Sequence, residues 1–65
     1  MKVLLWNIRT QKGLTLVQLA EISGIGKSTL NNIENAKVSP TLFQLETLAI
    51  ALGVRITDLF ESDLK

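Results

Sequence analysis

The sequence predicts an all-α fold, a compact bundle of about five short helices. Apolar residues recur at helical spacing along the whole chain, and no alternating strand pattern competes with them. Two segments begin with Thr and carry Gln three residues later, which is typical of a capping box at a helix start. Because the chain has only 65 residues, we expect one domain spanning residues 1–65.

The first two predicted helices are bounded by glycines. The first covers residues 2–12 and ends at Gly13, a usual signal at a helix C-terminus. The second begins at Thr15, whose hydroxyl and the amide of Gln18 can satisfy the free backbone groups of the first turn. Gly24 then makes a hinge before the third helix, which suggests a helix-turn-helix.

Three further helices complete the predicted bundle. The third covers residues 27–35, and the fourth begins at Thr41, with Gln44 completing its capping box, and ends at Gly53. A short fifth helix is expected to follow Thr57 as its cap, through Asp58 and Leu59 to Phe60.

The composition argues against an enzyme. The chain has no Cys and no His, which excludes disulfides, thiolate metal sites and histidine base chemistry. A domain of this size buries only about 60% of its unfolded surface, so little remains for a deep catalytic cleft. No base stands at a recognisable spacing beside a nucleophile. We therefore expect no catalysis, no cofactor and no metal.

No segment has the pattern of a signal peptide or of a membrane-spanning helix. The apolar run at the start is interrupted by Asn7 and Arg9, too early for a signal peptide, and no apolar stretch approaches the roughly 20 residues of a membrane span. The sequence therefore predicts a reducing, cytoplasmic location and no membrane partner.

The charges are distributed unevenly. Up to Pro40 there are five basic and two acidic side chains, a net charge of +3, whereas the rest of the chain has two basic and four acidic ones, a net charge of −2. A basic half that carries the hinge would orient the domain on a polyanion. The alternative is a chance distribution of surface charge.

The outer face of the third helix carries the strongest chemical signal. Successive helical residues advance by about 100°, which places Leu30 and Ile33 on one face. The opposite face then carries short hydrogen-bonding side chains: Ser28, Asn31, Asn32 and Asn35. Asn can pair with adenine, Ser can bond to several bases, and Lys27 can reach guanine or a phosphate. The alternative is a solvated polar face, but such a face usually carries more Glu and Lys.

Glu34 lies near the inward stripe of this helix, where an unpaired carboxylate would be costly. Arg9, late on the first helix and next to the apolar Ile8, is the candidate partner. The alternative is that both charged groups extend into water.

Several of the residues discussed above belong to a longer pattern that extends along the chain. Its members are Leu5, Ile8, Arg9, Gly13, Leu14, Thr15, Leu19, Ala20, Gly24, Ile25, Ser28, Thr29, Leu30, Ile33, Glu34, Pro40, Leu45, Leu48, Ala49, Ala51, Leu52, Gly53, Val54, Leu59 and Phe60. In this pattern the chain resembles the Cro/repressor-type (Xre-like) helix-turn-helix domains over nearly its whole length. The resemblance implies a lambda-repressor-like bundle that binds double-stranded DNA.

The resemblance also implies roles for individual residues. The base-reading positions fall on Lys27, Ser28 and Asn32, and Arg9 with Glu34 matches a structural ion pair. The resemblance implies that four other residues contact the DNA backbone or support the base-reading residues: Thr29, Asn31, Asn35 and Lys37.

The sequence departs from the pattern of similar domains at two positions, and both departures weaken the expected phosphate contacts. Leu16 stands where similar domains often have a phosphate-binding Gln, and Gly26 offers no side-chain oxygen as a helix cap.

Apolar residues stand at several positions where similar domains have polar ones: Leu4, Trp6, Leu16, Val17, Phe43 and Ile50. They suggest a surface for association with another chain, for which Phe43 and Ile50 are the favoured pair and Trp6 is a separate possibility. A slightly larger core, or scattered surface apolar residues, is the alternative.

These observations predict a sequence-specific DNA-binding protein, a transcriptional repressor that works as a homodimer with the third helix of each subunit in the major groove. The alternative function is a protein interaction module that keeps the fold without binding DNA.

Overall fold

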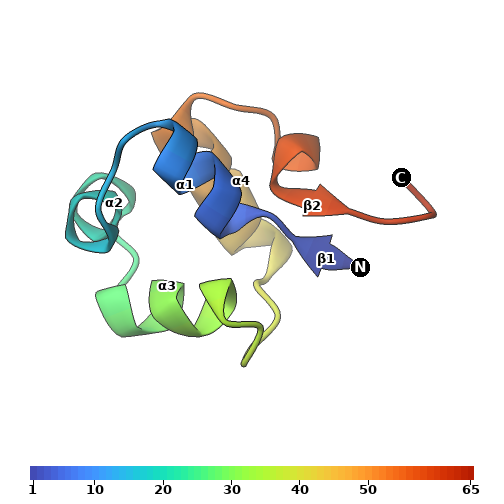
Figure 1. Ribbon diagram of the computed structural model, residues 1–65, viewed down its shortest axis with the longest axis horizontal. Coiled ribbons are helices and arrows are strands. Elements are labelled where there is room, and N and C mark those ends of the chain that lie inside the picture. Colours follow the sequence, from blue (N-terminus) through green and yellow to red (C-terminus); the bar gives the residue numbers. More distant parts are fainter.

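The computed structural model describes residues 1–65 and consists mainly of helices (Figure 1). It contains four α-helices, one short 3-10 helix and one two-stranded sheet. In chain order these are β1 (Lys2–Val3), α1 (Leu5–Gln11), α2 (Leu16–Ser23), α3 (Lys27–Glu34), α4 (Leu42–Leu52), η1 (Ile56–Leu59) and β2 (Phe60–Glu61). The helical class was predicted correctly, but there are four α-helices rather than about five, and the sheet was not predicted. None of the helices has the length and apolar content that would let it cross a membrane.

The start of the chain differs from the prediction. The first helix begins at Leu5 rather than at residue 2, because Lys2 and Val3 form β1 and pair antiparallel with β2. The register places Val3 opposite Phe60, and the Leu4 N–H donates to the Leu59 carbonyl oxygen at 2.8 Å. A strand of two residues is too short to show an alternating pattern, so sequence periodicity could not indicate it.

The starts of α2 and α4 are the predicted capping boxes. Thr15 Oγ1 accepts from the Gln18 N–H at 3.1 Å, and Gln18 Oε1 accepts from the Thr15 N–H at 2.9 Å. The equivalent distances for Thr41 and Gln44 are 3.0 and 2.9 Å. Each box satisfies two backbone donors that the first helical turn leaves free. These local interactions explain why both helix starts were predicted correctly.

The predicted fifth helix is shorter than expected and begins elsewhere. It is the 3-10 helix η1, and its cap is Arg55 rather than Thr57, which lies inside the helix. Asp58 determines this start, because its Oδ2 accepts from the Arg55 N–H at 2.9 Å. Phe60, expected at the end of this helix, belongs to β2.

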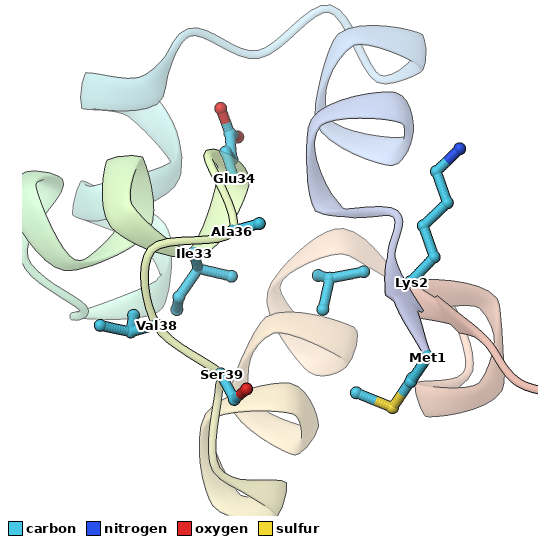
Figure 2. A pocket seen from close by; sticks show the side chains of 8 residues that line it. Met1, Lys2, Ile33, Glu34, Ala36, Val38 and Ser39 are labelled. Atoms are coloured by element: carbon cyan, nitrogen blue, oxygen red, sulfur yellow. The ribbon is translucent and has the colours of Figure 1, made fainter.

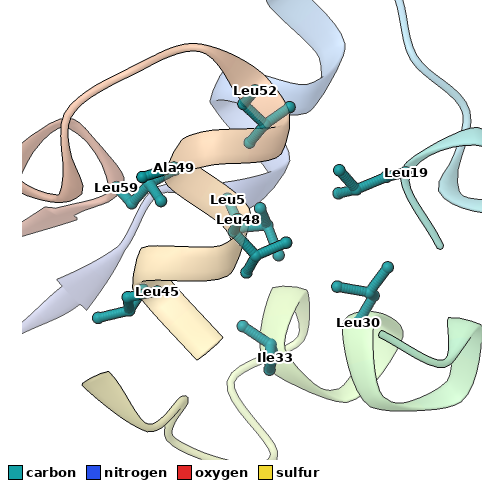
Figure 3. Packing of buried hydrophobic residues seen from close by; sticks show 9 residues of the cluster. All are labelled: Leu5, Leu19, Leu30, Ile33, Leu45, Leu48, Ala49, Leu52 and Leu59. Atoms are coloured by element: carbon teal, nitrogen blue, oxygen red, sulfur yellow. The ribbon is translucent and has the colours of Figure 1, made fainter. Parts of the chain in front are cut away.

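A core of nine buried residues holds the helices together (Figure 3). α4 runs through the centre and supplies four of them: Leu45, Leu48, Ala49 and Leu52. The other elements contribute the remaining five: Leu5, Leu19, Leu30, Ile33 and Leu59. Burying one such Leu or Ile side chain stabilises the fold by about 1.5–3 kcal/mol. Because α3 directs Leu30 and Ile33 into this core, its opposite face remains at the surface.

Candidate nucleic-acid interface

The candidate interface is built by α2, a short turn and α3. Gly24 ends α2 in the left-handed conformation, with φ of +74°, and the Ile25 N–H donates to Ser23 Oγ at 3.2 Å. This conformation favours glycine because it has no Cβ. α3 then begins at Lys27 without a side-chain cap, since Gly26 has none to offer. Figure 1 shows α3 along one side of the molecule, with its outer flank uncovered by other elements.

The outer face of α3 carries most of the polar residues that the sequence predicted there. Lys27 and Ser28 are exposed near its start, Asn31 is exposed in its middle, and Asn35 is exposed at its end. Thr29 and Asn32 are half-buried on the flank of this face. The predicted residues therefore lie on one continuous side of α3, and Lys37 is exposed in the loop that follows.

The predicted base-reading side chains have unused hydrogen-bonding groups, as do those of Thr29 and Lys37. Lys27, Ser28 and Asn32 form no side-chain hydrogen bond or ion pair within the chain. Asn31 and Asn35 differ, because Asn35 Nδ2 donates to Asn31 Oδ1 at 3.1 Å. The face thus has two kinds of asparagine, those bonded to each other and one that is free for an external partner.

Arg9 and Glu34 form a bidentate ion pair behind this face. Arg9 Nε donates to Glu34 Oε2 at 2.6 Å, and Nη2 donates to Oε1 at 3.0 Å. Arg9 Nη1 also donates to the Leu14 carbonyl oxygen at 2.9 Å, which fixes the connection between α1 and α2. Only 13% of the Arg9 side chain and 6% of the Glu34 side chain are exposed, so these groups do not extend into water.

The electrostatics of the pair favour the charged arginine. The hydrogen bond to Glu34 raises the pKa of Arg9, and the opposing effect of burial is smaller. Arg9 therefore stays charged at any ordinary pH. The pair connects α1 to the C-terminal end of α3 and so fixes how α3 lies on the bundle.

The C-terminal end of α3 contains a feature that sequence reasoning missed. Ala36 has a φ of +59°, and it is the single non-glycine residue of the chain with a positive φ. The Lys37 N–H donates to the Asn32 carbonyl oxygen at 2.9 Å, and the Ala36 N–H donates to that of Ile33 at 3.2 Å. This is the backbone pattern of a Schellman motif, which usually has glycine at the left-handed position. Because alanine occupies this position, no glycine marks the end of α3 in the sequence.

An open hollow of about 460 Å³ lies between β1 and this end of α3 (Figure 2). Its lining is mainly apolar and includes Met1, Val3, Ile33 and Val38. The sequence analysis did not predict it, because its walls come from distant parts of the chain. The hollow lies beside the end of α3 and takes no part in the polar face described above.

The predicted exposed apolar residues divide into two groups. Phe43 and Ile50 on α4 are 75% and 77% exposed, and Trp6 and Val17 are also exposed. Leu42, which the sequence analysis did not single out, is 79% exposed beside Phe43. The expectation was wrong for two residues with partly buried side chains: Leu4 and Leu16. Leu16 packs against the core.

Two helices joined by a glycine turn, with an outward polar face on the second, define the helix-turn-helix class of DNA-binding domain. The family model described as helix-turn-helix matches residues 7–59. The chain belongs to this family, and it is of the Xre-like type.

Relatives from bacteria and their phages carry the same domain. The chain is 42% identical over 50 residues to the immunity repressor protein of Bacillus phage phi105, covering 77% of this chain and 35% of that protein. It is 37% identical over 54 residues to the HTH-type transcriptional regulator PuuR of Escherichia coli (strain K12), covering 83% of this chain and 29% of PuuR. The chain thus spans about a third of the length of these relatives, both of which are named as a repressor or a regulator of transcription.

Solved structures of similar domains superpose on most of the chain. The restriction-modification controller protein C.AhdI from Aeromonas hydrophila gives a TM-score of 0.82 at 34% identity, covering 86% of this chain and 85% of that one. The N-terminal DNA binding domain of SinR from Bacillus subtilis gives a TM-score of 0.78 at 31% identity, covering 94% and 90%.

Proposed function

We propose that this chain binds double-stranded DNA sequence-specifically, with α3 in the major groove, and that it acts in the cytoplasm as a homodimeric transcriptional repressor without a cofactor. The observation that carries the proposal is the outer face of α3, where Lys27, Ser28 and Asn32 keep their hydrogen-bonding groups unused. Ser28 and Asn32 are short and permit close approach to base edges, whereas Lys27 can extend to a base or a phosphate. Membership of the helix-turn-helix family supports the same reading.

Each residue of the face has a distinct proposed role. Asn32 reads adenine, because an amide offers one acceptor and one donor in the spacing of the adenine edge. Ser28 contacts a neighbouring base, and Lys27 at the helix start reaches guanine or a phosphate. Residues that contact or support the DNA backbone surround them: Thr29, Asn31, Asn35 and Lys37.

The homodimer follows from the size of the domain. A single small module buries only about 600–1,000 Å² on DNA, and two half-sites roughly 34–36 Å apart give two-fold symmetric domains their affinity. Phe43 and Ile50 are the proposed contact between subunits, because both are large, apolar and mostly exposed on one helix.

Fluorescence anisotropy on a selected duplex and a scrambled one tests the proposal. We expect Asn32→Ala to cost about 1–3 kcal/mol per half-site and to relax preference at one base pair, as the loss of a bidentate contact predicts. Ser28→Ala should cost less. Lys27→Ala should weaken binding and, if its partner is a phosphate, reduce the salt slope by about one unit per contact while preserving sequence preference.

A protein interaction module is the second candidate, favoured by Leu16 and Gly26 at the phosphate-binding edge and by the exposed apolar residues of α4. The two functions differ in salt response, because binding to several phosphates weakens steeply with salt and an apolar protein contact does not. Circular dichroism must show that each variant is folded. The DNA-binding proposal fails if the wild type binds neither duplex at low salt, or if all three variants bind like the wild type.

A further inference from the structure

The edge of β1 that faces away from β2 carries unpaired backbone groups. In an antiparallel pair of strands, hydrogen-bonded and non-hydrogen-bonded residue pairs alternate. The Leu4 N–H bonds to the Leu59 carbonyl oxygen. The next pair, Val3 opposite Phe60, is therefore non-hydrogen-bonded, and its backbone groups point away from the partner strand. The Phe60 carbonyl oxygen accepts from Lys65 Nζ at 2.6 Å, whereas the N–H and carbonyl of Val3 form no hydrogen bond within the chain.

The hollow beside the end of α3 lies along this free edge of β1. β2 lies on one side of β1 (Figure 1), and the loop that follows α3 faces its other side across the hollow (Figure 2). On that loop the backbone N–H groups of Val38 and Ser39 also have no partner within the chain. Apolar side chains line the space between, and its volume of about 460 Å³ lies within the range of roughly 300–1,000 Å³ that is usual for ligand sites. Unpaired backbone groups beside an apolar lining suit an extended polypeptide.

The charges at the hollow favour an acidic group on the occupant. Two charged side chains contribute to the lining, Lys2 and Glu34. Glu34 is already paired with Arg9, whereas Lys2 is exposed and has no ion-pair partner. Successive side chains of a strand point to opposite faces, so Lys2 and Val3 lie on different faces of β1. A strand added to β1 would therefore place an apolar residue beside Val3 and the next residue on the side of Lys2.

We propose that this hollow is a docking site for an extended segment of another protein, in which a large apolar residue stands next to an acidic one. The segment adds to β1 as a third strand, and its backbone pairs with the free N–H and carbonyl of Val3. Its apolar side chain fills the hollow, and its carboxylate lies near Lys2. Backbone pairing supplies affinity, and the hollow with its single unpaired cation supplies specificity.

Selection from a phage-displayed library of random hexapeptides tests the proposal, with the Val38→Asp variant as the counter-target. Val38 lines the hollow but is not packed against the core, so this variant should fold. We expect enriched sequences that pair a large apolar residue with Asp or Glu and that bind the wild type about tenfold more tightly than the variant, because a carboxylate in the hollow loses hydration. Val17→Asp on α2 is the matched control, since Val17 is 48% exposed and Val38 is 47% exposed. It should bind the selected peptides like the wild type.

Nuclear magnetic resonance with a synthetic peptide of the enriched sequence locates the site. We expect the largest amide shifts at Val3, Val38 and Ser39. Lys2→Glu should lower peptide affinity about fivefold, whereas Lys12→Glu, the same charge change at an exposed residue away from the hollow, should have little effect.

Backbone methylation of the peptide tests the strand pairing itself. N-methylation at the residue that bonds to Val3 should lower affinity about tenfold, and methylation one residue further along should not, because only alternate residues of a strand face β1.

Three results would overturn the inference. The first is a selection in which no sequence prefers the wild type to Val38→Asp. The second is a set of selected peptides whose amide shifts lie outside the hollow. The third is a set of shifts at the hollow that grow with protein concentration in the absence of peptide, which would assign the hollow to a second copy of this chain. No DNA enters these experiments, so their outcome leaves the DNA-binding proposal to its own test.

Discussion

At the scale of single residues, Arg9 and Glu34 have the largest expected influence on stability. Their two hydrogen bonds match the fork of the guanidinium to the two oxygens of the carboxylate, and both side chains are largely buried. A buried pair is not in itself strongly stabilising, since both groups lose their hydration. Losing one partner is different, because the other charge is then left buried without compensation.

We predict that Arg9→Met or Glu34→Gln alone lowers the free energy of unfolding by roughly 3–5 kcal/mol. That is a large share of the stability of so small a domain. The double variant should lose less than the sum of the two, because it strands no charge. Thermal melts of the three variants check this. Additive losses below about 1 kcal/mol each would instead be typical of a surface pair.

Ala36 gives a second prediction at this scale. Its φ of +59° is a conformation that costs an L-residue about 1–2 kcal/mol, and Ala36→Gly removes that cost. Part of the gain is offset because glycine is more flexible in the unfolded chain. We therefore expect a net stabilisation of roughly 0.5–1 kcal/mol, seen as a higher melting temperature.

The matched control for this prediction is Gly24→Ala. Gly24 has a similar φ of +74°, and a Cβ added there would meet no atom within 4 Å, so the substitution adds backbone strain without a steric clash. It should destabilise the protein. A lower melting temperature for Ala36→Gly would contradict the strain argument.

At the scale of secondary-structure elements, the parts that the sequence predicted are those determined locally. The capping boxes of Thr15 and Thr41 each join residues three positions apart. The helical period of α3 shows which of its faces is buried, and this can be worked out from the residues of α3 alone. The pairing of β1 with β2 joins residues 2–3 to residues 60–61, and nothing in either short segment indicates the other. Local sequence patterns cannot predict long-range pairing of this kind.

The candidate site likewise has features that local sequence patterns predict and features that they do not. The outward face of α3 was predictable from its period, and the need of Glu34 for a partner followed from its inward position. Leu16 was misjudged because its exposure depends on how α2 packs, which a single position in the sequence does not reveal. The Asn31–Asn35 bond and the strained Ala36 depend on rotamers and backbone angles and have no sequence signature of their own.

At the scale of the whole molecule, the exposed apolar side chains of α4 raise the question of what covers them. Phe43 and Ile50 are seven residues apart, close to two helical turns, so they lie along one line of the helix. Leu42, at the start of α4, is also exposed but lies about 80–100° around the helix from this line. Phe43 and Ile50, both large, apolar and at least three-quarters exposed, are the contact that we propose between two copies related by a two-fold axis.

We predict that the wild type sediments as a dimer and that the double variant Phe43→Glu with Ile50→Glu sediments as a monomer. Like charges then face each other across the two-fold axis, and each carboxylate loses hydration without gaining a partner. Trp6→Lys, a charge introduced at an exposed apolar residue on α1, is the control and should leave the dimer intact. The monomeric variant should keep its preference for a single half-site, since α3 is unchanged, but lose the added affinity of two correctly spaced half-sites. A wild type that remains monomeric at high concentration without DNA would remove this surface as the dimer contact.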